Sequence, residues 1–126
     1  MQRDMDLVRQ ILFALEDKQH THTDRLMIEG YEQNVISYHV ALLEDAGLVA
    51  NTTEAKTFGG GHHFKGTHNC FPDRLTWEGH EFLETSRDQG RWEKAKGIMI
   101  KKGGGLSFSV MQTLLVRLMS EAVLSK

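Results

Sequence analysis

Side chains that could hold a metal ion gather in the segment GHHFKGTHNC, residues 61–70. If this segment forms a hairpin that turns at Lys65 and Gly66, alternation along its strands places three metal-binding side chains on one face: His63, His68 and Cys70. Imidazole and thiolate are the usual ligands of Zn²⁺. The segment lacks a Cys-x-x-Cys pair or a helical His-x-x-x-His pair, so solvated histidines are the favoured interpretation and no metal or cofactor is expected.

A second group of side chains could contact DNA. Four amides and hydroxyls lie on the outer face of a predicted helix, near its start: Gln33, Asn34, Ser37 and Tyr38. Asn and Gln can pair bidentately with adenine, and Ser and Tyr can reach base edges or phosphates. The predicted helix itself has no Lys or Arg. Attraction to phosphate would therefore depend on cations elsewhere. Three lie in or beside the predicted hairpin, Lys56, Lys65 and Arg74, and five lie near the end of the chain: Arg91, Lys94, Lys96, Lys101 and Lys102.

Enzyme chemistry has little support in the sequence. Cys70 lies in a glycine-rich segment that offers a nucleophile neither a base nor an oxyanion site. The glycine clusters at residues 59–61 and 103–105 lack the preceding strand and the following Lys-Ser/Thr of a phosphate-binding loop. We therefore expect a protein that is not an enzyme.

The elements that would position these residues follow from hydrophobic spacing. Amphipathic helices are predicted from Asp4 to about residue 18, over residues 32–46, from Thr76 onward, over residues 91–102 and over residues 108–124. Two strands, residues 48–51 and 70–75, flank the hairpin. Leu26 to Ile28 is predicted to be a short strand or a stunted helix. His39 and His80 are predicted to face inward and to be hydrogen-bonded.

The bulk composition indicates one cytoplasmic domain without a membrane span. The chain has 126 residues, one cysteine and a net charge of -2. Residues 1–50 carry four Lys/Arg against nine Asp/Glu, whereas residues 91–126 carry seven against two. Such a charge split is typical of two ends that attract each other, and it also permits a basic tail that contacts phosphate.

Two stretches resemble winged-helix regulators. ISYHVALLEDAGLV, residues 36–49, is similar to the recognition helix and first wing strand of arsenic-sensor-type repressors. RLTWEGHEFL, residues 74–83, resembles a second wing strand and closing helix. Over most of the chain, four blocks resemble a family of short bacterial and phage proteins, domain of unknown function 2513: MQRDMDLVRQIL, IEGYEQNVISYHVALLEDAGLV, RLTWEGHEF and KKGGGLSFSV. This resemblance implies a winged-helix-like fold, an undetermined role and no catalytic residue.

The sequence departs from the helix-turn-helix pattern before the recognition helix. Arg25 and Glu29 fall on positions that should be buried, and His39 replaces an aliphatic residue. The first helix of the motif is therefore expected to be short, distorted or replaced by a strand.

Taken together, these patterns predict an α+β, mainly helical protein. Residues 1–90 would form a winged helix-turn-helix-like core with a two-stranded β-hairpin wing, and residues 91–126 a helical extension that packs on the same core or on a second copy. The predicted function is binding of double-stranded DNA by a non-enzymatic regulator. The alternative is a protein-interaction module of the same fold. A homodimer through the last helix is expected at even odds with a monomer, and no small-molecule ligand is evident.

Overall fold

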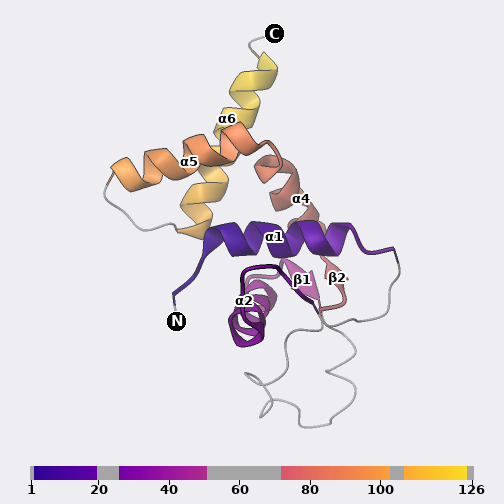
Figure 1. The fold of residues 1–126 in the computed structure, drawn as a ribbon. Helices are drawn as coiled ribbons and strands as arrows, with labels where there is room; N and C mark the ends of the chain where they lie inside the picture. The colour runs from indigo at the N-terminus through magenta and orange to yellow at the C-terminus, as the bar shows by residue number, and fades with distance from the viewer. Residues whose placement is uncertain (1, 20–25, 51–71, 103–106, 125–126) are drawn as a thin grey trace. The chain divides into compact units, whose positions relative to one another are not determined.

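The computed structural model describes residues 2–19, 26–50, 72–102 and 107–124, which are mainly helical with one small two-stranded antiparallel sheet (Figure 1). The chain divides into two compact units, unit 1 (Met1–His80) and unit 2 (Glu81–Lys126), and each is described by itself. The boundary that the sequence suggested at residue 90 stays a prediction.

Helix α1 (Met5–Glu16) is the first element of unit 1 and begins as predicted. The Asp4 carboxylate caps it by accepting the backbone N–H groups of Asp6 and Leu7 at 3.0 and 3.1 Å. This satisfies two amides that have no partner within the helix. The helix buries six apolar side chains: Met5, Leu7, Val8, Ile11, Leu12 and Leu15. Burial of such side chains stabilises a fold by about 1.5–3 kcal/mol each, so α1 is a main part of the core.

The segment before the next helix corrects a prediction. Residues 26–28 form neither a strand nor a helix, and a turn follows at Glu29 and Gly30. Gly30 has a φ of 90°, and the backbone N–H of Tyr31 donates to the carbonyl of Ile28 at 3.2 Å. The three apolar residues Leu26, Met27 and Ile28 precede a left-handed glycine, and so short a segment makes too few backbone hydrogen bonds to nucleate a helix.

Helix α2 (Gln33–Asp45) occupies the predicted place of the recognition helix. Its buried side chains are Ile36, His39, Val40 and Leu43. Gly47, with a φ of 80°, follows the helix as expected for a left-handed C-terminal residue. Both α1 and the sheet contact this helix.

The sheet joins β1 (Val49–Ala50) to β2 (Arg74–Leu75), with Val49 opposite Leu75 and Ala50 opposite Arg74. This pairing confirms that the chain returns antiparallel through Arg74, and the hairpin tip predicted between the strands lies outside the described residues. Thr76 then links the sheet to the next helix. Its hydroxyl donates to the Gly47 carbonyl at 2.6 Å and accepts the N–H of Gly79 at 3.1 Å.

Helix α4 (Trp77–Ser86) corrects the prediction for His80. Phe82 and Leu83 are fully buried, but His80 is exposed and Trp77 is 76% exposed. The face of α4 that approaches the end of α2 and the sheet carries Gly79, where an added Cβ would lie 2.1 Å from the carbonyl oxygen of Leu48. Since successive helix residues are about 100° apart, His80 turns away from this contact.

Unit 2 contains the end of α4 together with α5 (Gln89–Lys101) and α6 (Phe108–Leu124), and α6 has the predicted bounds. Its core is partly aromatic, because the Phe82 ring lies 6.4 Å from the Trp92 ring and 4.8 Å from the Phe108 ring. Met111 and Leu115 are the buried residues of α6. None of the described helices combines the length and apolarity needed to cross a membrane.

Candidate binding face on helix α2

A buried polar cluster fixes how α2 lies on α1. The imidazole of His39, which is fully buried, accepts the backbone N–H of Asp4 on Nε2 at 2.8 Å. Its Nδ1 lies 2.9 Å from the Val35 carbonyl, so Nδ1 carries the proton in this arrangement. The Tyr31 hydroxyl donates to the second oxygen of the Asp4 carboxylate at 3.1 Å. The prediction that His39 is buried and hydrogen-bonded is confirmed, and its inward position leaves the opposite side of α2 to solvent.

The four residues predicted to contact bases lie on α2, but they differ in accessibility. Asn34 and Tyr38, one turn apart, are exposed, whereas Gln33 and Ser37 are half-buried. The Gln33 amide donates to the Leu26 carbonyl at 3.4 Å and lies 3.3 Å from the Met27 sulfur. Asn34 and Tyr38 are therefore the accessible part of the predicted contact set.

The charge of the α2 face is acidic. Residues 26–50 contain four Asp/Glu and no Lys or Arg, and Glu29, Glu32 and Asp45 are exposed. We call these three carboxylates, together with Asn34 and Tyr38, the acidic face; Glu29 and Glu32 precede α2, and Asp45 is its last residue. Over the sequence of unit 1, seven Lys/Arg stand against twelve Asp/Glu, which gives a net charge of -5. A duplex with one negative charge per about 1.7 Å of its axis is repelled by such a unit.

Of the three cations predicted in the wing, only Arg74 falls in the described residues. It is exposed on β2, and its guanidinium donates to the Leu75 carbonyl at 3.2 Å. The other two wing cations, Lys56 and Lys65, lie outside the described residues. The same holds for the weak metal candidates His63, His68 and Cys70. Within the described residues, no three His, Cys, Asp or Glu side chains form a group that could hold a metal ion.

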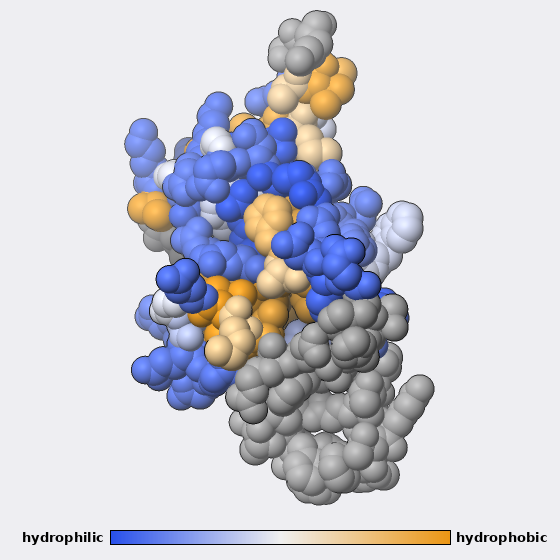
Figure 2. All heavy atoms as spheres, turned by 45° about the vertical axis from the view of Figure 1, so that its right-hand side comes forward, coloured by the Kyte–Doolittle hydropathy of each residue, from blue (hydrophilic) through white to orange (hydrophobic). Residues whose placement is uncertain are grey.

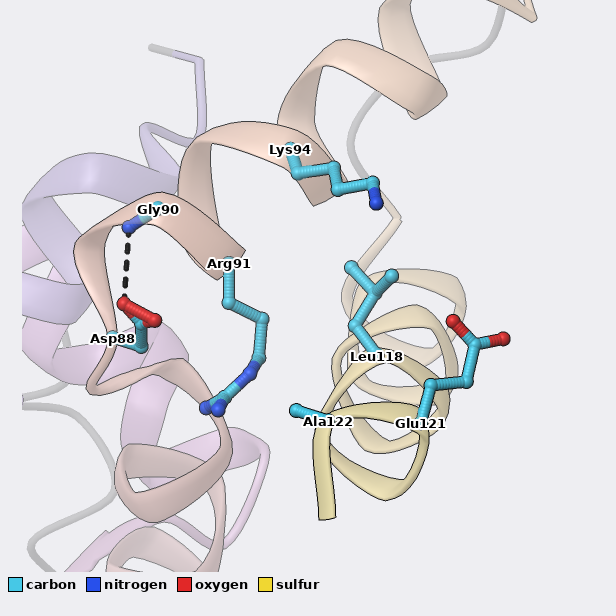
Figure 3. A pocket seen from close by; sticks show the side chains of 7 residues that line it. All are labelled: Asp88, Gly90, Arg91, Lys94, Leu118, Glu121 and Ala122. Carbon is cyan, nitrogen blue, oxygen red and sulfur yellow. Dashed lines mark hydrogen bonds between the residues drawn. The ribbon is translucent and has the colours of Figure 1, made fainter. Parts of the chain in front are cut away.

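Unit 2 has an open pocket of about 450 Å³ between the start of α5 and the second half of α6 (Figure 3). Its lining combines two cations, two carboxylates and a small apolar floor: Asp88, Gly90, Arg91, Lys94, Leu118, Glu121 and Ala122. In Figure 3 the Lys94 side chain extends from α5 toward α6. The Arg91 guanidinium instead donates to the Thr85 carbonyl of α4 at 3.4 Å. Because the charges of the lining balance, the pocket favours neither anions nor cations.

The end of α6 exposes apolar side chains. Val116, Val123 and Leu124 are 46%, 66% and 82% exposed. Residues 120–124, Val123 among them, are all exposed. Figure 2 shows a largely hydrophilic described surface with small apolar areas, including one where α6 ends. The predicted homodimer through this helix stays a prediction.

The sequence did not reveal the roles of two residues near α2. Asp4 is a hydrogen-bond partner of both Tyr31 and His39. Gly79 lets α4 approach the carbonyl of Leu48 closely. One signal for the first was the histidine at an otherwise aliphatic position of the helix, which requires polar partners when buried. For Gly79, a glycine inside a predicted helix was a signal, because glycine there is costly without a packing reason.

Comparisons with known proteins place the chain among uncharacterised proteins. Residues 2–105 match the family described as "Hypothetical protein (DUF2513)". A protein of Haemophilus influenzae, described as "Uncharacterized protein", is 28% identical over 123 residues, which cover 96% of this chain and 98% of that protein. No solved structure matches. The family predicted from the four sequence blocks is thereby confirmed.

Proposed function

The chain belongs to the DUF2513 family, whose description names no activity, and we propose from its geometry that it is a non-enzymatic protein-interaction module of winged-helix-like fold. In this proposal the acidic face of α2 binds a protein partner. The order α1, α2, β1, β2, α4 supports the winged-helix-like arrangement. The non-helical residues 26–28 distinguish it from a standard helix-turn-helix, in which a helix lies there.

The observation that carries this proposal is the charge of the exposed residues on α2 and just before it. Glu29, Glu32 and Asp45 accompany Asn34 and Tyr38 on a segment without a single Lys or Arg. A tyrosine among solvated carboxylates suits a protein partner, because tyrosine is enriched at interfaces and the carboxylates steer a basic surface toward it. The expected partner is therefore a protein with a basic patch.

A structural role for His39 supports the non-enzymatic part of the proposal. Both ring nitrogens are engaged by backbone groups of Asp4 and Val35, and the side chain is fully buried. A general base must reach the proton that it removes from a substrate. His39 holds two helices together instead.

The test uses a photo-crosslinking amino acid in place of Tyr38, in full-length protein, to trap the partner in cell extract. The trapped protein is then purified, and its affinity is measured for unmodified protein and for the Glu32→Lys, Asp45→Lys double variant. We expect the double variant to bind at least tenfold more weakly. The control, Glu78→Lys with Glu81→Lys, reverses two exposed charges on α4. Equal affinities of the α2 variant and unmodified protein would contradict the proposal.

DNA binding through α2 is the second candidate function. It is supported by the element order and by the exposure of Asn34 and Tyr38 at the place of a recognition helix. In this version Gln33, Asn34, Ser37 and Tyr38 enter the groove, and Lys56, Lys65 and Arg74 contact phosphates. The Asn34→Ala, Tyr38→Ala double variant, which keeps the charge, should then abolish binding to its DNA site. Unchanged DNA binding by this variant would eliminate the second candidate.

A further inference from the structure

The positive charge of the chain is concentrated on α5, in the unit that does not contain α2. Residues 91–102 hold five Lys/Arg and one Glu, and unit 2 as a whole has eight Lys/Arg against five Asp/Glu. We propose that α5 binds the phosphate backbone of double-stranded DNA through Lys94, Lys101 and Lys102. This inference is independent of the protein partner proposed for α2, and it places the DNA contact on α5 rather than on α2.

Lys94 and Lys101 lie on the solvent side of α5, and Lys102 follows directly at its C-cap. Lys94, Lys101 and Lys102 are exposed, whereas the opposite side of the helix buries Trp92, Ala95 and Met99. Lys94 and Lys101 are seven residues apart, which is two helical turns and about 10 Å along the axis. Gly97, between them, has no atom within 4 Å of the position of a Cβ. The backbone of α5 is therefore open to close approach at the middle of the lysine row.

The ammonium groups of these lysines are available for a ligand. Within the described part of the chain, Lys94, Lys101 and Lys102 form no ion pair, whereas Lys96 lies 3.5 Å from the Glu93 carboxylate. Arg91 is half-buried and its guanidinium donates to the Thr85 carbonyl at 3.4 Å, so it is not counted among these cations. Lys94 is exposed, although it lines the same pocket as the carboxylates of Asp88 and Glu121 (Figure 3). Three cations remain for phosphate.

Double-stranded DNA fits this surface better than other polyanions. Single strands are usually held by exposed aromatic rings that stack on bases, and the aromatic side chain of α5, Trp92, is fully buried. Membrane surfaces are bound by helices with a broad exposed apolar face, whereas Ile100 is the exposed large apolar residue on α5. A helix fits the major groove of B-form DNA, which is about 12 Å wide, but not the deep, narrow major groove of RNA duplexes.

The test is the salt dependence of binding to a fluorescent mixed-sequence DNA duplex, measured by anisotropy with full-length protein. Three phosphate contacts predict a slope of about -2.7 in log affinity against log salt, or about a fortyfold loss from 50 to 200 mM. The Lys94→Gln, Lys101→Gln variant keeps one contact, so its slope should be about -0.9 and its loss about fourfold. Circular dichroism checks that both proteins are folded.

The matched control is the Arg87→Gln, Arg117→Gln variant, which removes two exposed positive charges, one just after α4 and one on α6 of the same unit. It should keep a slope near that of the unmodified protein. A control slope as small as that of the lysine variant would overturn the proposal, because net charge rather than α5 would then be responsible. Absence of binding at 50 mM salt, loss of binding in the Asn34→Ala, Tyr38→Ala variant, or tighter binding to duplex RNA or anionic vesicles would overturn it as well.

Discussion

The Nε2 atom of His39 accepts the backbone N–H of Asp4 at 2.8 Å, although the two residues are 35 positions apart in the sequence. Asp4 is also the N-cap of α1 and the acceptor for the Tyr31 hydroxyl. One small cluster thus connects the start of α1, the turn before α2 and the middle of α2. Because it lies on the buried side of α2, it determines which residues of that helix remain exposed.

Removal of the His39 ring should destabilise unit 1. His39→Ala leaves a cavity and deprives the partly buried N–H of Asp4 of its acceptor, so we expect the free energy of unfolding to fall by about 2–4 kcal/mol. Urea denaturation followed by circular dichroism measures this change. The control is His80→Ala, at an exposed position of α4, which should change stability by less than about 0.5 kcal/mol. Similar losses in the two variants would contradict the role given to His39.

Ionisation of Tyr31 should weaken the fold at alkaline pH. Partial burial raises the pKa of the Tyr31 phenol above its ordinary value of 10.0, and the hydrogen bond to Asp4 and the negative charges of Asp4 and Asp6 raise it further. A raised folded-state pKa means that the folded protein holds this proton more tightly than the unfolded chain. The stabilisation is therefore complete below pH 10.0 and is lost as the pH rises through the folded-state pKa.

The measurement is ultraviolet absorbance of tyrosinate during alkaline titration, together with urea denaturation at each pH. The Tyr31 phenol should deprotonate above its ordinary pKa, which is the delayed step of the titration, and the protein should lose stability as it does. Tyr31→Phe should remove both the delayed step and this loss of stability. Tyr38→Phe, which removes the other tyrosine, should keep both. Persistence of the delayed step in Tyr31→Phe would show that its assignment is wrong.

A methyl group at Gly79 should be poorly tolerated. An added Cβ would lie 2.1 Å from the Leu48 carbonyl oxygen, so α4 must shift away from the sheet. We expect Gly79→Ala to lower the free energy of unfolding by about 1–3 kcal/mol, as is usual for overpacked positions. Gly97→Ala is the matched control, because it lies inside α5 with no atom within 4 Å. That change should stabilise the protein by up to about 1 kcal/mol through helix propensity.

Self-association through α6 is expected to depend on its exposed valines. If two copies pair through this helix, the Val116→Lys, Val123→Lys variant should be monomeric where the unmodified protein is a dimer, because a buried unpaired charge opposes association. Light scattering over a concentration series measures the molar mass. Ser109→Lys with Ser120→Lys adds the same charge at exposed polar positions of α6 and should leave the dimer intact. A monomeric unmodified protein at the highest concentration would eliminate this interface.

Several elements were predictable because their causes are local. The Asp4 cap and the apolar spacing from Val8 to Leu15 predicted α1, and Gly47 marked the end of α2. A cap and a hydrophobic stripe involve residues within a few turns of each other, so they can be read from sequence spacing. The same applies to the charge of the candidate site, because the lack of Lys and Arg in residues 26–50 is a matter of composition alone.

The amino-acid sequence thus determined the helices, the return of the chain through Arg74 and the acidic character of residues 26–50, because each depends on neighbouring residues or on composition. Tertiary structure decided that Gln33 turns back toward Leu26, that His80 is exposed and that His39 binds Asp4. These outcomes depend on which surfaces meet across long sequence separations. Spacing along one helix does not specify that choice, since packing selects one of several faces that the same pattern allows.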